Sequence, residues 1–138
     1  MTVAALNSTY ALPGHLSFHE GPGGLPVIEI RNRFATARLC VHGAHVLSFC
    51  PKDGADLLFL SERAVFQPGK AIRGGVPVCW PWFGPDPQGL GRPAHGFVRT
   101  RLWDLRRTET LAGGETLVEL GLRDNAETRA LWPHGFDL

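Results

Sequence analysis

The residues best suited to chemistry lie close together between Lys70 and Arg101, in one stretch rich in glycine and proline. Its arginines carry planar guanidinium groups that fit phosphate or carboxylate. Its histidine can donate or accept a hydrogen bond near neutral pH, and its aromatic rings can stack on the C–H face of a sugar or on a base. This combination predicts a site for a polar ring that carries a negative charge. The candidate binding residues are Arg73, Trp80, Phe83, His95 and Arg99.

Each candidate also has a purely structural interpretation. Trp80 and Phe83 could form a packed corner of the core, because aromatic clusters in proteins are often core contacts. His95, which lies between Ala94 and Gly96, could cap the end of a strand. Arg73 precedes two glycines and could brace its own loop by donating to backbone carbonyls. The pattern alone leaves both interpretations open.

Prolines determine what backbone can carry these side chains. Four of them, at positions 77, 81, 85 and 87, each fix φ and remove a backbone donor. Neither a helix nor a central strand fits that spacing. We therefore expect a rigid, irregular loop that lies on a sheet and forms the wall of a pocket.

The composition limits the partners. Lys and Arg number 14 against 13 Asp and Glu, a net charge of +1, which argues against nucleic acid because nucleic-acid-binding domains present a strongly basic face. No stretch approaches the length of about 18 apolar residues that a membrane span needs. No glycine-rich nucleotide motif opens a helix, so we expect no cofactor.

The cysteines indicate a reducing compartment. Cys40, Cys50 and Cys79 are odd in number, lack C-x-x-C spacing and sit in apolar runs, as buried free thiols do. The first residues lack the basic region and the apolar run of a secretory signal. A cytoplasmic location is the resulting expectation.

The elements that must position the loop are strands. Residues 1–25 are weakly patterned and are expected to form an arm or one added strand around Leu16 to His19. From Pro26 the apolar pattern has a period of two, and residues 26–138 predict an all-β fold, an antiparallel β-sandwich. Strands are expected at 27–30, 34–41, 44–50, 56–60, 101–107 and 115–123, with single helical turns at 61–64 and 125–132.

A metal site is the weakest alternative. His42, His45 and His95 would be its ligands in a cupin-like barrel, but no carboxylate follows at a suitable spacing. In an extended chain, His42 and His45 would also face opposite sides of the sheet. We therefore expect no metal.

Two motifs carry a family resemblance. KAIRGGVPVCWPWFG and PAHGFVRTRLWDL, in this order, resemble the motif pair of the hexose-6-phosphate mutarotases in the aldose 1-epimerase superfamily. The resemblance extends over roughly residues 26–138 and includes GAHVLSFCPKDGADLLFLSERAVF and ALWPHGFDL. It implies a β-sandwich of the galactose mutarotase type and an isomerase that interconverts the α and β anomers of a hexose 6-phosphate.

The resemblance also implies that this chain is incomplete. Members of the family run to about twice its length, so the chain corresponds to an N-terminal half whose sandwich is unfinished and whose strand edges are expected to be unpaired. The family's acid and base, a histidine and a glutamate, come from the other half. What remains would grip the substrate: Arg73 and Arg99 at phosphate or sugar oxygens, His95 at a hydroxyl in a supporting role, and Trp80 and Phe83 as pocket walls.

A second function from another class stays open. The chain could be a non-catalytic module that binds sugar phosphates or associates with itself, because the half that carries the family's acid and base is absent. Its protein partner would then be a second copy of itself or the missing C-terminal half. If the chain alone were active, Asp86 or Glu119 would be the first carboxylates to consider beside His95.

Overall fold

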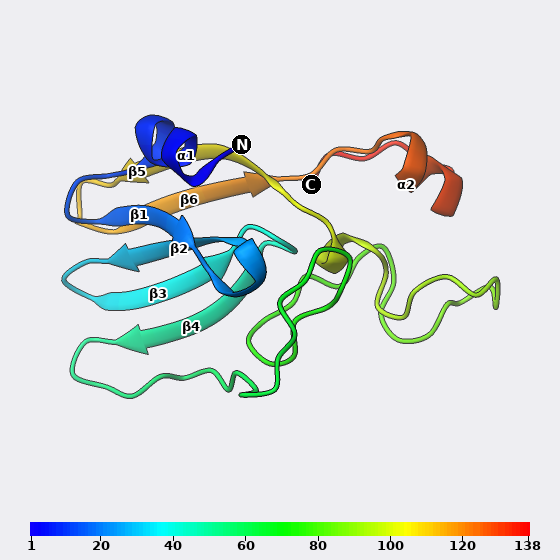
Figure 1. Ribbon diagram of the computed structural model, residues 1–138, viewed down its shortest axis with the longest axis horizontal. Helices are drawn as coiled ribbons and strands as arrows, with labels where there is room; N and C mark the ends of the chain where they lie inside the picture. The colour runs from blue at the N-terminus through cyan, green and yellow to red at the C-terminus, as the bar shows by residue number, and fades with distance from the viewer.

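Antiparallel strands dominate the computed structural model, which describes all residues from 1 to 138 (Figure 1). One sheet has four strands in chain order, β1 (Leu16–Glu20), β2 (Pro26–Arg31), β3 (Ala35–Cys40) and β4 (His45–Pro51). A hairpin, β5 (Asp104–Thr110) and β6 (Thr116–Gly121), forms a second sheet. The remaining elements are the helices α1 (Val3–Tyr10) and α2 (Ala126–Leu131) and the 3-10 turns η1 (Pro22–Gly24) and η2 (Val98–Thr100). The predicted all-β antiparallel class is confirmed.

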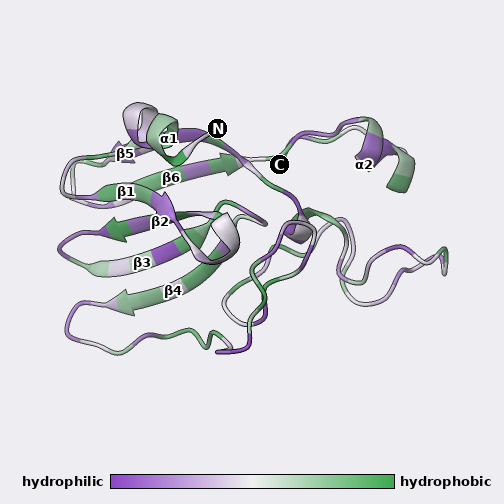
Figure 2. Ribbon diagram, in the orientation of Figure 1, coloured by the Kyte–Doolittle hydropathy of each residue, from purple (hydrophilic) through white to green (hydrophobic).

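Both faces of the four-stranded sheet are covered in part, which explains why neighbouring residues of β2 are both buried. Ile28 faces the hairpin, where it packs with Phe18, Leu105 and Leu6 of α1. Val27, the residue before Ile28, faces the opposite side of the sheet. It packs with a second set of apolar residues, some of them from the long connection after β4: Leu25, Cys40, Leu47 and Ile72. Figure 2 shows these apolar segments along the strands.

A third apolar cluster ties the glycine- and proline-rich loop to the end of the chain. Phe97 and Leu122 are buried there. The ring centroid of Trp80 lies 6.1 Å from that of Phe97 and 4.8 Å from that of Trp132, with the rings edge to face. Leu122 and Leu138 also exchange backbone hydrogen bonds of 3.1 and 3.0 Å.

Residues 1–25 contribute a helix as well as the strand β1. The helix α1 begins after Thr2, whose hydroxyl accepts a 3.2 Å hydrogen bond from the Ala5 N–H. That threonine, followed by Val-Ala-Ala, was the available signal for a helix that the sequence analysis did not predict. Leu6 on this helix is buried against the sheet.

Side chains and loops occupy the two outer edges of the four-stranded sheet. At β1, the Asn7 amide donates to the Phe18 carbonyl at 2.6 Å and accepts from the Phe18 N–H at 2.9 Å. At β4, Val46 exchanges backbone hydrogen bonds with Val76, and the Phe49 carbonyl accepts from Leu57 at 2.9 Å. The edges expected to be unpaired are therefore partly occupied within the chain.

The strand predicted at 56–60 is wrong. Asp56 accepts hydrogen bonds from the N–H groups of Phe49 and Leu58, so the chain turns there instead of extending. Phe59 is consequently 78% exposed, and Leu60 makes only an isolated bridge with Gly74. The helical turn predicted at 61–64 is a single hydrogen-bonded turn rather than a helix.

Other local predictions agree with the structure to within a few residues. The strands expected at 34–41 and 44–50 are β3 and β4, and the last two expected strands are β5 and β6. The helical turn expected at 125–132 is α2, which begins with a reciprocal capping box between Asn125 and Thr128.

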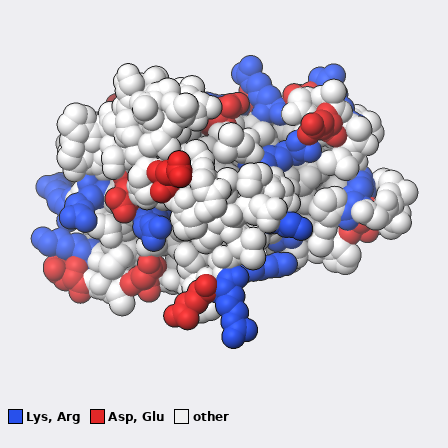
Figure 3. All heavy atoms as spheres, in the orientation of Figure 1, with Lys and Arg blue, Asp and Glu red and all other residues white.

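Charges of both signs are interspersed on the face shown in Figure 3. Neither helix has the length and apolar character needed to cross a bilayer.

The bonds between α1 and β1 predict a stability effect. In Asn7→Ala, the N–H and C=O of the buried Phe18 lose their partners, so the free energy of unfolding should fall by about 2 kcal/mol. Urea denaturation followed by circular dichroism measures this change. Ser8→Ala, at an exposed position on the same helix, is the control and should change little. Equal stabilities for the two variants would contradict the assignment.

Candidate functional site

Residues 42–45, which run from the connection after β3 to the first residue of β4, hold the backbone on both sides of Arg73. We call this segment the histidine turn. The His42 Nε2–H donates to the Lys70 carbonyl at 2.8 Å, and the His45 Nε2–H donates to the Gly74 carbonyl at 2.7 Å. Both imidazoles are buried. The expectation that they face opposite sides of the sheet is wrong, because the turn curls and directs both rings to the same loop.

The backbone next to Arg73 has no room to move. Gly75 has φ of +61°, and a Cβ built there would lie 2.1 Å from the Val46 carbonyl oxygen and 2.9 Å from His45 Nε2. The Gly75 N–H donates to the Phe59 carbonyl at 2.7 Å, and the Arg73 carbonyl accepts from Ser61 at 3.2 Å. The Arg73 side chain itself is exposed and takes part in none of the hydrogen bonds or ion pairs of the protein. The Arg73 guanidinium is therefore unpaired, while the backbone that carries it is fixed.

The same turn also contacts the second motif. The Gly43 N–H donates to the Arg101 carbonyl at 2.7 Å, and Val41, just before the turn, accepts from the Trp103 N–H at 3.1 Å. Burial lowers the pKa of His45, with the charges of His42 and Arg99 acting in the same direction against the bond to Gly74. The histidine turn therefore contacts both sequence motifs, through Lys70 and Gly74 in the first and Arg101 in the second.

Hydrogen bonds to Gly84 fix the orientation and the tautomer of the His95 ring. The backbone N–H of His95 donates to the Gly84 carbonyl at 2.7 Å, and the ring atom Nδ1 of His95 accepts from the Gly84 backbone N–H at 3.1 Å. Because Nδ1 is an acceptor, the neutral imidazole carries its proton on Nε2. No hydrogen bond within the protein uses Nε2, so this atom can donate to a ligand oxygen.

Aromatic candidates divide between the core and the surface. The ring of Phe83 is 81% exposed and lies edge-on to the His95 imidazole, with centroids 4.7 Å apart. The ring of Trp80 packs in the third cluster, 4.6 Å from the centroid of Phe136. The Trp80 carbonyl accepts from the Phe97 N–H at 3.1 Å, which fixes the segment after His95.

An ion pair that the sequence analysis missed closes the loop between Phe83 and His95. Arg92 and Asp86 lie 2.6 Å apart, with side chains only 9% and 6% exposed. Hydrogen bonds from Arg92 and from three backbone N–H groups hold the pKa of Asp86 far below its usual range. The Arg92 guanidinium also stacks over Trp82 at 4.3 Å and donates to the Leu131 carbonyl at 3.2 Å. The paired arginine and aspartate, six residues apart around prolines and glycines, were the available signal.

This pairing corrects one prediction. Asp86 was considered as a proton-transfer partner of His95, but its oxygens accept hydrogen bonds from Arg92 and the loop backbone. Glu119, the other carboxylate considered, is exposed on β6 opposite Arg107 of β5. Neither carboxylate is hydrogen bonded to His95.

The five predicted site residues form one close group and one separate member. Phe83 contacts His95, and Arg99 Nη2 donates to the carbonyl of Ala94, next to His95, at 3.0 Å. Trp80 supports this group from the core, whereas Arg73 is connected to it through the histidine turn and not by direct contact. None of the five lines the cavity of about 610 Å³ over β1–β3 or the one of about 380 Å³ near Lys52.

Two of the three histidines considered as metal ligands bind backbone carbonyls instead. The structure contains no group of three or more His, Cys, Asp or Glu side chains arranged to hold a metal ion. Of the three histidines considered, His42 and His45 use Nε2 for backbone carbonyls.

Comparison with known proteins adds the family. The profile of the family described as Aldose 1-epimerase matches residues 26–138. An Escherichia coli (strain K12) protein named "Putative glucose-6-phosphate 1-epimerase" is 44% identical over 114 residues, which make up 83% of this chain and 38% of that protein. A Cenchrus ciliaris protein of the same name is 36% identical over 121 residues, 84% of this chain and 36% of that protein.

A solved structure also resembles this chain. The crystal structure of a "putative mutarotase (YeaD)" from Salmonella typhimurium superposes with a TM-score of 0.84 at 36% sequence identity, covering 93% of this chain and 42% of that one. The chain therefore spans about two fifths of the length of the relatives it matches.

A pair of glycine substitutions tests the backbone around His95. Gly96 (φ +70°) has the Trp80 carbonyl oxygen 1.8 Å from where a Cβ would lie, whereas Gly84 (φ +80°) has nothing within 4 Å. Gly84→Ala should cost about 1–2 kcal/mol from its backbone conformation alone. Gly96→Ala should cost more than about 4 kcal/mol, because the two segments must also separate. Chemical denaturation measures both, and similar losses would contradict the close approach.

The buried His45 predicts a pH dependence of stability. Its pKa is lower in the folded than in the unfolded chain, so the unfolded chain binds the proton more readily. The contribution is fully present above about pH 6.5, the ordinary histidine value, and is lost as the pH falls from there toward the folded pKa. In His45→Gln, the unfolding free energy should decline less steeply over that interval. The exposed His134→Gln is the control, and a slope unchanged by His45→Gln would contradict the prediction.

Proposed function

Because the chain belongs to the aldose 1-epimerase family, we propose that it is the substrate-gripping part of a hexose-6-phosphate 1-epimerase. The reaction interconverts the α and β anomers of the sugar by opening and reclosing its ring. Relatives named as glucose-6-phosphate 1-epimerases support the substrate class. The candidate residues are Arg73, His95 and Arg99, with Phe83 and Trp80 as neighbouring aromatic surface.

The observation that carries the proposal is the orientation of His95. Its Nδ1 accepts from the Gly84 N–H, so the neutral ring presents Nε2–H as a donor whose direction the backbone fixes. A fixed donor suits a sugar oxygen on which negative charge develops, because no reorganisation is needed when the charge appears. Phe83 beside it offers an exposed apolar edge to the sugar ring.

The phosphate would bind to guanidinium groups. Arg73 has no ion-pair partner, and its backbone is fixed through Gly74 and Gly75. Arg99 uses one nitrogen, Nη2, for the Ala94 carbonyl, while its buried Nε has no partner. Charge-assisted bonds from arginine to phosphate are stronger than neutral ones, so these two side chains supply most of the expected affinity.

The chain offers no acid and base pair of its own. Ring opening needs one group to protonate the ring oxygen and another to take the anomeric proton. Asp86 is engaged by Arg92, and Glu119 lies exposed on β6. In the family these groups come from the portion of the protein that this chain does not span, so we expect binding by this chain without turnover.

That reasoning also favours the second candidate function, a non-catalytic module that binds sugar phosphates or associates with itself. Exposed apolar side chains favour self-association, because it would bury them, and Phe59, Phe83 and Leu90 are among those that are mostly exposed. Association by strand pairing is less favoured, since β1 and β4 are partly occupied at their edges.

Exchange spectroscopy by NMR tests the proposed function. The rate of α-to-β exchange in glucose 6-phosphate should match that of buffer with this chain alone and should rise with a longer chain that includes the C-terminal portion of the family. The short chain should nevertheless bind glucose 6-phosphate, and His95→Gln and Arg73→Gln should each weaken binding about tenfold by removing a charge-assisted or fixed hydrogen bond.

Arg107→Gln, on the exposed hairpin, is the matched control and should leave binding unchanged. Acceleration by the 138-residue chain alone would overturn the view that the acid and base lie outside it. Binding unaffected by either site variant would overturn the assignment of Arg73 and His95.

A further inference from the structure

A second set of polar side chains lies on the four-stranded sheet, apart from the candidate site. Strand register places Ser17, Glu29, Arg38 and Ser48 in one row across β1, β2, β3 and β4. In the adjacent row, Arg31 pairs with Thr36, and the Arg31 N–H donates to the His15 carbonyl at 2.8 Å. Residues paired across antiparallel strands share a face, so these side chains project together.

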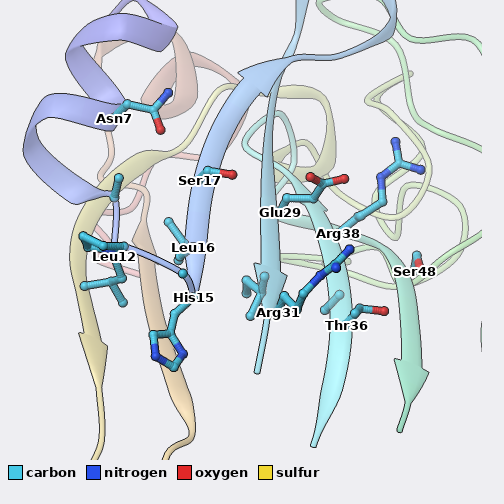
Figure 4. Close-up of a pocket in the computed structure, with 15 residues that line it drawn as sticks. Asn7, Leu12, His15, Leu16, Ser17, Glu29, Arg31, Thr36, Arg38 and Ser48 are labelled. Atoms are coloured by element: carbon cyan, nitrogen blue, oxygen red, sulfur yellow. The ribbon is translucent and has the colours of Figure 1, made fainter. Parts of the chain in front are cut away.

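This face is apolar and covered at one end but polar and open at the other. Val27 and Cys40, two residues along from Glu29 and Arg38, lie on the same face and are buried under the connection that contains Ile72. The polar rows instead line a cavity of about 610 Å³, bounded on one side by residues 11–16 (Figure 4). That volume is within the range of small-molecule sites.

Arg31 and Arg38 form no ion pair in this chain, although the charge of Arg38, after hydrogen bonds from Ser48, Leu58 and Phe49, helps to lower the pKa of Asp56. None of the six ion pairs includes Arg31, Arg38 or Glu29, although Glu29 is directly opposite Arg38 in the sheet. Six other arginines each form an ion pair: Arg92, Arg101, Arg106, Arg107, Arg123 and Arg129. Half of the twelve arginines are thus unpaired, and Arg31 and Arg38 are the two of these that line the cavity.

Two buried nitrogen atoms of residues that line the cavity also lack hydrogen bonds. They are Nε of Arg38 and Nδ1 of His15, on opposite sides of the hollow. A buried polar atom without a partner costs free energy, and such atoms are uncommon in folded proteins. Because each atom has almost no accessible surface, its side chain would have to turn toward a ligand oxygen in the cavity to gain a hydrogen bond.

The lining indicates the chemistry of that ligand. Two guanidinium groups on adjacent strands suit a phosphate, which accepts several charge-assisted bonds at once. The Glu29 carboxylate and the hydroxyls of Ser17 and Thr36 can bind hydroxyl groups of the same molecule. No Phe, Tyr or Trp side chain lines the cavity, so stacking on a base is not expected.

We propose that the cavity over β1–β3 is a second binding site, which takes a small phosphorylated molecule with free hydroxyl groups through Arg31 and Arg38. The site is separate from the one assigned to Arg73 and His95, since none of its lining residues belongs to that group. The proposal stands on the register, the cavity and the unpaired donors, and it does not depend on the proposed function.

Titration of the full 138-residue chain with inorganic phosphate, followed by 1H–15N NMR, tests the site. The Arg38 Nε–H signal and the backbone signals of residues 15–17 should shift and saturate. Arg31→Gln and Arg38→Gln should each weaken this binding at least about tenfold, because each removes a charge-assisted contact. Arg63→Gln, an exposed arginine without an ion pair, is the matched control and should leave the affinity unchanged.

Two further measurements separate the possibilities. Arg73→Gln should leave the phosphate-induced shift at Arg38 unchanged, so failure of the proposed function and failure of this proposal remain distinguishable. Glycerol 3-phosphate should bind more tightly than inorganic phosphate, and Glu29→Gln should reduce that advantage. Phosphate binding that is unchanged in the Arg31→Gln/Arg38→Gln double variant, or no shift at Arg38 at tens of millimolar phosphate, would overturn the proposal.

Discussion

The structure around the candidate site depends on two buried imidazole donors. His42 and His45 bind the carbonyls of Lys70 and Gly74, and so they fix the loop that carries Arg73 on the end of a β-hairpin. A loop with four prolines cannot complete a sheet ladder, so its carbonyls need donors from elsewhere. The histidine turn supplies them from inside the protein, where water is excluded. The guanidinium of Arg73, a candidate for substrate binding, can then remain free while its backbone is fixed.

Rigidity on the other side of the site has a different origin. There the Arg92–Asp86 ion pair closes the loop, Trp82 stacks on its cation, and Trp80 is anchored among rings from the end of the chain. The part of the site around Arg73 is therefore stabilised by hydrogen bonds from buried histidines. The part around His95 is stabilised by an ion pair and aromatic packing. Salt weakens exposed electrostatic contacts far more than buried ones. Because Asp86 and Arg92 are largely buried, both parts of the site should tolerate changes in ionic strength.

The sequence was sufficient for the class of fold because alternation along β2 to β6 is strong and local. It was also sufficient to locate the loop, since proline and glycine spacing excludes regular structure. It was insufficient for the roles of His42 and His45, whose partners lie about thirty residues away and are backbone atoms that no side-chain pattern reveals. The strand predicted at 56–60 was wrong because the Asp56 carboxylate accepts backbone hydrogen bonds that turn the chain, despite the apolar residues that follow. The ring of Trp80 could not be assigned to core or pocket because the rings it packs against are distant in the sequence.

The occupied edges of the four-stranded sheet have a consequence for behaviour at high concentration. An open strand edge is a template on which identical chains can add one after another, which leads to fibrils. Here a single asparagine, Asn7, imitates a neighbouring strand at β1, and the loop residues 57 and 76 do the same at β4. At these two edges, side chains and loops rather than further strands thus give the chain part of its own protection against templated polymerisation.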